Sequence, residues 1–307
     1  NKTIDTQMNI VRDKVKCINT KYTGKGISIA FIDTGICKNN DFDSRIKCFY
    51  DVVNHKNYVY DDCGHGTHVA GICSGSGANS NGKYRGIAPE SNIVMIKALD
   101  FEGKGTASDV LTGIQWVADN YKKYNIRILN MSIGAGITNT KDPLVRAAEI
   151  LWDMGIVVVA AAGNNGPQKG TISSPGISKK IITVGSVDDI NVPENDIGKS
   201  YSGRGPTKEC VIKPDVVAPG TNIISCLCED NKNNNYYKSL SGTSMSTPIV
   251  SGAIALLLEK APNLKPDDIK FMLKQSCHNL ECSPNRQGWG LLDIENLLNR
   301  EVIYVRK

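Results

Sequence analysis

Short runs of apolar and β-branched residues alternate along this chain with longer segments of helical period, and this alternation narrows the choice of fold most. The runs expected to form strands are Ile27–Ile32, Ile93–Ile96, Ile126–Leu129, Ile156–Ala160 and Ile181–Val184. Because the fourth run is apolar at every position, it is typical of a parallel strand that is covered on both faces. Strands that alternate with helices predict an α/β fold built on a mostly parallel sheet.

The clearest helical period lies between Ser108 and Tyr124. Its apolar residues recur three and four positions apart, and we expect Ser108 to cap the helix, with Asp109 in the first turn. Such a helix would connect two parallel strands. Three further helices are expected at Met245–Leu258, Pro266–Gln275 and Asp293–Asn299.

Length and charge exclude several classes of protein. The 307 residues are 40% hydrophobic and 22% charged, which is typical of a globular chain with a full core, and no linker divides them. The net charge of +5 is spread out, without the basic block that a nucleic-acid or membrane-surface partner requires. The longest apolar runs, Ile156–Ala162 and Ala253–Leu258, are far shorter than the roughly 20 residues of a membrane span. We therefore expect neither a nucleic acid nor a membrane as partner.

Ten cysteines are scattered through a chain that is large enough to fold without disulfides. We therefore expect reduced, buried thiols, with disulfides as the second alternative. Cys226 and Cys228 are too close in sequence to pair comfortably. Cys277 and Cys282 could form a bridge only if the turn between them brings their Cα atoms together.

Asp33 directly follows the first expected strand, in the tripeptide Asp33–Gly35. Sites in open α/β sheets form at the carboxyl ends of strands, although an aspartate there can also simply cap a turn. The same tripeptide occurs in aspartic proteases, which need two such carboxylates. The chain has no second Asp-Thr-Gly or Asp-Ser-Gly, so that alternative falls behind.

Two of the four histidines, His65 and His68, lie in a segment of small residues from Gly64 to Gly71. Together with Cys63 and Cys73 they could be zinc ligands, but their spacing matches no common structural zinc pattern. His65 opens the expected helix and can face a cleft, so it is the better candidate for a general base. We interpret His68 as a packed histidine that is hydrogen-bonded within its helix.

Ser244 precedes an apolar helical run, and Pro248 lies early in the same helix. At a helix N-terminus, free amides and the helix dipole favour negative charge on a bound carbonyl oxygen. An N-cap would also explain a serine here. It would not explain Gly242 and the small neighbouring residues, which allow a substrate to approach closely, so a nucleophilic serine is the better interpretation.

Three segments, Asp33–Gly35, His65–Gly71 and Gly242–Pro248, together resemble the signature motifs of the subtilisin-like serine proteases, or subtilases. Their order along the chain, Asp then His then Ser, is also that of subtilisin itself. The resemblance extends from about Thr23 to Leu292 and implies one subtilisin-like peptidase domain over residues 1–307. It also implies an α/β fold with a three-layer, doubly wound, mostly parallel sheet flanked by helices.

The resemblance implies a serine endopeptidase in which Ser244 is the nucleophile, His65 the general base and Asp33 the orienting carboxylate. Asn164 would be the side-chain donor of the oxyanion hole, although alone it could be a turn residue after a buried strand. The substrate-binding residues would be Gly103, Gly105, Ser132, Gly134, Ala161 and Gly163. The small side chains at 161–163 leave room for a large apolar residue before the scissile bond, so we expect broad specificity with that preference.

The chemistry requires no cofactor, but many members of this family hold structural calcium. Asp41 matches one family ligand, Thr3 stands where another would be, and the loop Ser74–Lys83 differs in length, so we assign no calcium site. The chain opens with Asn1, and we expect the family's prosegment to have been cleaved off or left out.

The expected partners are protein or peptide substrates. The segments Ser173–Gly176 and Ser202–Pro206 are most similar to the bacterial intracellular-type branch of the family. Because the many cysteines are compatible with a reducing compartment, we expect a cytoplasmic location, with secretion as the alternative. A scaffold that binds peptides without cutting them is the main rival, but such proteins usually lose a triad member, and here none is lost.

Overall fold

A seven-stranded parallel sheet lies at the centre of the molecule, in a computed structural model that describes residues 5–136, 139–190, 200–230 and 235–305. The strands follow the order β2-β3-β1-β4-β5-β6-β7, and every pairing between neighbours is parallel. Their bounds are Ser28–Asp33 (β1), Ile46–Asp51 (β2), Asn92–Lys97 (β3), Ile126–Met131 (β4), Val157–Ala161 (β5), Ile182–Ser186 (β6) and Val216–Ala218 (β7). The expected α/β fold with a mostly parallel sheet is confirmed.

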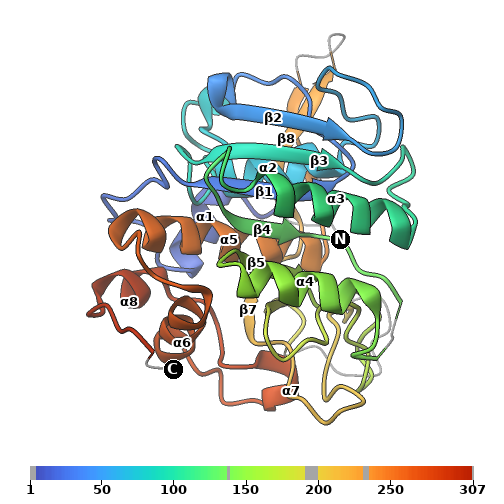
Figure 1. Ribbon diagram of the computed structural model, residues 1–307. Helices are drawn as coiled ribbons and strands as arrows, with labels where there is room; N and C mark the ends of the chain where they lie inside the picture. Colours follow the sequence, from blue (N-terminus) through green and yellow to red (C-terminus); the bar gives the residue numbers. More distant parts are fainter. Residues whose placement is uncertain (1–4, 137–138, 191–199, 231–234, 306–307) are drawn as a thin grey trace.

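Helices cover both faces of this sheet. Figure 1 shows α3 and α4 on the near face, with α2 and α5 behind the strands, which gives the expected three layers. The helices are Met8–Lys14 (α1), His65–Ser74 (α2), Ala107–Asn120 (α3), Pro143–Asp153 (α4), Thr243–Lys260 (α5), Pro266–Ser276 (α6), Pro284–Gln287 (α7) and Ile294–Asn299 (α8). Two short 3-10 turns, Asp43–Arg45 and Ala78–Ser80, complete the helical elements of the described residues.

The most apolar helix, α5, lies at the centre of the molecule and packs on β4, β5 and β6. Nearly all of its residues from Thr243 to Leu258 are buried. The strands of the sheet that it contacts are buried along almost their whole length, so both faces of the sheet bury apolar surface. No helix within the described ranges is both long and apolar enough to cross a membrane.

The α3 helix begins earlier than its sequence pattern predicts. Thr106, and not Ser108, is the N-cap: its hydroxyl accepts from the Asp109 amide while the Asp109 carboxylate accepts from the Thr106 amide. This reciprocal capping box satisfies two free amides at once, which a Ser108 cap would not do. The helix also ends at Asn120, before the expected Tyr124.

Two antiparallel strands outside the main sheet, β8 (Ile223–Asp230) and β9 (Asn235–Leu240), form a hairpin beside α2. Neither strand was predicted from the sequence, and the same holds for β2 and β7 of the main sheet. The helix α2 comes so close to the hairpin that a Cβ atom added at Gly71 would lie 2.4 Å from the Ser225 hydroxyl and 2.7 Å from the Cys226 sulfur. The hairpin therefore fixes the position of α2.

One disulfide, between Cys37 and Cys228, joins the loop after β1 to strand β8, and the other eight cysteines are free thiols. The expectation of reduced thiols throughout is therefore wrong for this pair. The two residues are 191 positions apart in the sequence, so only the folded topology brings them together. The pairs weighed from sequence spacing, 226 with 228 and 277 with 282, are not bonded.

Candidate active site

The candidate site lies where the order of the strands reverses. β1 lies between β3 and β4 in the sheet, and a crevice opens beyond the carboxyl ends of strands at such a point. Asp33 is the last residue of β1, and Ser132 follows the last residue of β4. Four strand ends and the N-termini of α2 and α5 supply the predicted site segments.

A cleft of about 560 Å³ lies at this edge. Six of the predicted residues line it, namely His65, Gly103, Gly105, Ser132, Gly134 and Ser244. Ala161 and Gly163 do not line this cleft: both are buried, and Gly163 packs against Ser173. Asn164 is exposed but is also outside the lining of the cleft. The structure therefore brings two residues of the predicted triad, His65 and Ser244, into one cleft together with the segments on either side of them.

Asp33 and His65 form a direct pair. Asp33 Oδ1 lies 2.7 Å from His65 Nδ1 and also accepts the Thr34 amide, while its other oxygen is buried without a partner in the described residues. Since a carboxylate accepts hydrogen bonds, Nδ1 carries the proton and Nε2 is left with a lone pair. The imidazole is thus held in the tautomer that a general base requires, and Asp33 contacts an imidazole instead of the second carboxylate of an aspartic protease.

The pKa of His65 is raised above its ordinary value. Burial, the largest influence, acts to lower it, but the charge and hydrogen bond of Asp33, with a contribution from Asp61, outweigh burial. The side chain itself is 26% exposed, so solvent still reaches the ring. The protonated imidazole is stabilised, which suits a base that must hold a proton during the reaction.

Glycines allow these two segments to approach. Gly35 has φ 126°, and a Cβ atom there would lie 2.2 Å from the Tyr60 carbonyl oxygen. A Cβ atom at Gly66 would lie 2.2 Å from the Gly35 carbonyl oxygen. Larger residues would therefore push the first turn of α2 away from the end of β1, and with it His65 away from Asp33.

Ser244, in the first turn of α5, is bound to Ser132 in both directions. The Ser244 hydroxyl donates to the Ser132 carbonyl at 2.8 Å, and the Ser132 hydroxyl donates to the Ser244 carbonyl at 2.8 Å. The second bond exists because Pro248, four residues on, has no amide proton to offer that carbonyl. The Ser244 hydroxyl thus points at the backbone and not at His65, and rotation about one side-chain bond has to turn it toward the imidazole.

Asn164 is tied to the residue before Ser244. Its side-chain oxygen accepts from the Thr243 amide at 3.0 Å and from the Thr243 hydroxyl at 3.1 Å. The oxygen is therefore anchored, and the side-chain NH₂ group makes no hydrogen bond within the described residues. That NH₂ group is available as a donor beside the N-terminus of α5.

His68 is a structural residue. Its Nε2 lies 3.0 Å from the Ile223 carbonyl and 3.1 Å from the Lys238 carbonyl, so its partners are in the β8–β9 hairpin and not in its own helix as expected. Burial lowers the pKa of His68 to about 3, so it is neutral. A protonated Nε2 cannot bind a metal, and no group of three or more His, Cys, Asp or Glu in the described ranges could hold one.

Asp41, the residue that matches a calcium ligand of the family, does not fit that role here. Its two carboxylate oxygens accept from the Tyr237 hydroxyl at 2.8 Å, the Cys226 thiol at 3.3 Å and the Asn79 amide at 2.9 Å. Proton donors therefore occupy the places where a cation would need further oxygen ligands. Thr3, the other expected counterpart, lies outside the described residues.

Sequence reasoning missed Asp61 and Lys97, which support the end of β1. The Asp61 carboxylate binds Thr34 and the first turn of α2, and Lys97 Nζ donates to the Thr34 carbonyl at 2.6 Å. A signal for Asp61 was present, since an acidic residue just before a helix often satisfies its free amides. Lys97 ends an apolar strand, and its complete burial could not be read from that pattern.

This chain is similar to known proteins of a single family. The model of the subtilase family matches residues 24–290. The serine protease AprX of Bacillus subtilis (strain 168) is 44% identical over 294 residues, which cover 89% of this chain and 66% of AprX. Subtilisin DY of Bacillus licheniformis is 35% identical over 288 residues, covering 93% of this chain and 95% of that protein.

Solved structures lead to the same family. A cold-adapted subtilisin-like serine proteinase has a TM-score of 0.71 and 33% identity, covering 90% of this chain and 91% of its own. Sphericase has a TM-score of 0.78 and 27% identity, covering 92% of this chain and 96% of its own. The matches cover the sheet, the cleft and all three motifs, and the chain belongs to the subtilase family.

Proposed function

We propose that this chain is a serine endopeptidase in which Asp33, His65 and Ser244 form the catalytic triad. The observation that supports this most strongly is the 2.7 Å contact between Asp33 and His65, on an imidazole that opens onto the same cleft as Ser244. A serine hydroxyl is a weak nucleophile near neutral pH, and it needs such a base to take its proton.

In the proposed mechanism, His65 Nε2 accepts the Ser244 proton while Ser244 Oγ attacks the peptide carbonyl carbon. Asp33 keeps the imidazole in the correct tautomer and stabilises the imidazolium. The Ser244 amide and the Asn164 NH₂ group donate to the oxygen that becomes negative. The imidazolium then protonates the leaving amine, and water releases the acyl group in a second step with the same base.

We also propose how the substrate lies. An extended peptide would pair with backbone at Gly103–Gly105 on one side and Ser132–Gly134 on the other, as an added strand. Apolar side chains line the same cleft, namely Leu99, Val110, Met131, Ile133 and Leu144. These residues favour apolar side chains in the substrate. A preference for a large apolar residue just before the scissile bond stays a prediction, since Ala161 and Gly163 do not line this cleft.

Substitution of Ser244 by alanine tests the proposal. The variant should lose cleavage of an unstructured protein while its thermal unfolding stays close to that of the parent. Ser241→Ala is the matched control, because Ser241 is an exposed serine three positions earlier whose hydroxyl is hydrogen-bonded to Asn222. If Ser244→Ala retains full cleavage, or if the parent binds peptides without cutting them, the scaffold alternative is correct instead.

Two broader expectations stay predictions. A single peptidase domain over residues 1–307 predicts one cooperative unfolding transition. A cytoplasmic location predicts that the protein fractionates with soluble cytoplasmic markers and not with secreted ones.

A further inference from the structure

The carboxylate of Asp61 lies behind the Asp33–His65 pair and binds both segments that carry it. Its Oδ1 accepts from the Thr34 hydroxyl at 2.8 Å and from the Gly64 amide at 2.7 Å. Its Oδ2 accepts from the Thr67 amide at 2.9 Å and from the Thr67 hydroxyl at 2.6 Å. Asp61 itself is buried, with 8% of its surface exposed.

These contacts replace a helix cap that α2 lacks. The N-cap residue, Gly64, has no side chain that could accept from the free amides of the first turn. The Asp61 carboxylate accepts from the Thr67 amide instead. The Thr34 hydroxyl in turn accepts from the Gly66 amide at 2.8 Å. One carboxylate thus fixes the residue after Asp33 and the residues on both sides of His65.

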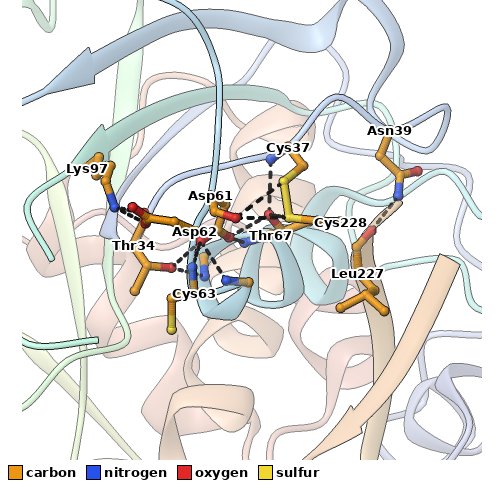
Figure 2. The surroundings of a disulfide bond; sticks show 12 residues. Thr34, Cys37, Asn39, Asp61, Asp62, Cys63, Thr67, Lys97, Leu227 and Cys228 are labelled. Atoms are coloured by element: carbon orange, nitrogen blue, oxygen red, sulfur yellow. Dashed lines mark hydrogen bonds and ion pairs between the residues drawn. A yellow bond between two sulfur atoms is a disulfide. The ribbon is translucent and has the colours of Figure 1, made fainter. Parts of the chain in front are cut away.

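The Cys37–Cys228 disulfide lies directly against Asp61 (Figure 2). The two sulfur atoms are 3.7 and 3.4 Å from the Asp61 carbonyl oxygen. The Cys37 amide donates to the Thr67 hydroxyl at 3.1 Å, which is the same hydroxyl that binds Asp61. The bond therefore clamps Asp61 and Thr67 between the loop after β1 and strand β8. Both cysteines are half-buried, so a small thiol can reach them.

We propose that Asp61 is the positioning residue for His65 and that the Cys37–Cys228 disulfide locks it in place, so that a thiol reductant lowers catalysis. This inference rests on the proposed peptidase function. Asp61 touches neither the reacting atoms nor the cleft, and it acts through Thr34 and the first turn of α2.

The groups that face His65 make the proposal testable through pH. Asp33 comes from β1, Asp61 from the loop before α2 and Lys238 from β9, while His68 beneath it is neutral. The two carboxylates raise the pKa of His65 and Lys238 lowers it. Removing the Asp61 charge therefore moves the pKa of His65, and with it the acidic limb of kcat/KM, to lower pH.

A dithiol can donate the two electrons that reduce the Cys37–Cys228 disulfide. One thiolate of the dithiol attacks a sulfur of the disulfide, the S–S bond breaks, and a mixed disulfide forms. The second thiol of the dithiol then attacks the mixed disulfide and closes it into a cyclic disulfide. Two electrons and two protons pass to the protein, which gains the Cys37 and Cys228 thiols.

The reduced protein keeps other contacts that hold the same elements together. The Asn39 side chain donates to the Leu227 carbonyl at 3.1 Å, and Tyr237 of β9 binds Asp41. These bonds join the loop after β1 to the hairpin independently of sulfur. Reduction should therefore loosen the site without unfolding the chain.

The first test is Asp61→Asn, which keeps one acceptor oxygen and removes the charge. We expect kcat to fall about ten- to a hundredfold with little change in KM, and the acidic limb of kcat/KM to move to lower pH. Asp119→Asn is the matched control: this exposed carboxylate on α3 accepts from the Gln115 side chain, and its loss should leave the limb in place. An Asp61→Asn enzyme with parental kcat and an unmoved limb would overturn the positioning role.

The second test uses dithiothreitol on the parent chain, so it does not depend on a variant that folds. Mass spectrometry after alkylation follows the gain of two thiols at residues 37 and 228. We expect kcat to fall several-fold and to recover on reoxidation. The unfolding midpoint of the reduced enzyme should stay above the assay temperature. The Cys37→Ser, Cys228→Ser double variant should have the low kcat of the reduced parent, and dithiothreitol should not lower it further. The control Cys210→Ser, at an exposed free cysteine, should respond to dithiothreitol as the parent does.

Two results separate this proposal from the peptidase assignment. If the parent enzyme cleaves protein through Ser244 but keeps full kcat once residues 37 and 228 are reduced, the redox lock is wrong and the function stands. If the parent enzyme neither cleaves protein nor reacts at Ser244, the proposed function fails first.

Discussion

The two halves of the candidate active site are built from different chemistry. On the side of His65, buried charged side chains hold the structure. Asp33 accepts from the Thr34 amide, Asp61 accepts from the Thr34 hydroxyl, and Lys97 donates to the Thr34 carbonyl. On the side of Ser244, uncharged groups do so. Ser251 donates to Asn130, Asn130 donates to the Ser132 hydroxyl, and that hydroxyl donates to the Ser244 carbonyl.

This difference predicts which half of the site responds to pH and to redox state. A network of buried carboxylates and histidines changes with pH because protons bind to it, and its disulfide changes with redox state. A chain of hydroxyl and amide groups carries no charge that titrates near neutral pH. The base should therefore be the adjustable partner, and the nucleophile with its oxyanion donors the constant one.

The largest effect should come from the uncharged half. Asn164→Ala should lower kcat by on the order of a hundred- to a thousandfold, the size of effect known from subtilisin itself, with KM nearly unchanged. The loss should be the same at every pH, because no titrating group is removed. Gln168→Ala, an exposed amide four residues on, is the control. A loss that varies strongly with pH would break the contrast between the two halves.

A smaller effect should appear in the stability of the charged half. The pKa of His68 is lowered to about 3 in the folded chain, against about 6.5 unfolded, so the unfolded chain binds more protons between these values. Stability from the neutral His68 is complete above about pH 6.5 and is lost as the pH falls below it. Between pH 7 and pH 5 this residue should cost about 2 kcal/mol of unfolding free energy.

Urea unfolding at the two pH values measures that loss. In His68→Gln, which cannot take up a proton, the difference between pH 7 and pH 5 should shrink by about the same 2 kcal/mol. An undiminished difference in the variant would mean that other groups carry the acid sensitivity of this half.

The smallest effect concerns Asp41 under the hairpin. Because protein donors satisfy its carboxylate, a calcium chelator should leave the melting temperature unchanged. Tyr237→Phe, which removes one donor, should cost about 1 kcal/mol. Differential scanning calorimetry with and without chelator measures both, and a large chelator-induced drop in Tm would show that a bound cation stabilises the protein.

The proposed catalytic residues were easier to find from the sequence than the residues that support them. Asp33, His65 and Ser244 each lie in a contiguous motif at the start or end of an element, so their neighbours in sequence reveal them. Asp61 acts across a loop on Thr34 and Thr67, and no local pattern states which amides it will reach.

The same limit holds for the fold. Five of the seven strands of the parallel sheet were predicted from their apolar runs, but β2 and β7 were not. The strands β8 and β9 carry mixed residues and are defined by pairing with each other. Cys37 and Cys228 meet only after the sheet, α2 and the hairpin are in place. Such contacts depend on the topology of the fold, which cannot be read from a short segment of sequence.

Labelling with a fluorophosphonate, followed by peptide mapping, tests the account most directly. One label per molecule should appear, on Ser244, and His65→Ala should slow its formation sharply because the hydroxyl then lacks its base. Folded, cleaving protein that carries the label on another residue, or that stays unlabelled at Ser244, would contradict the account.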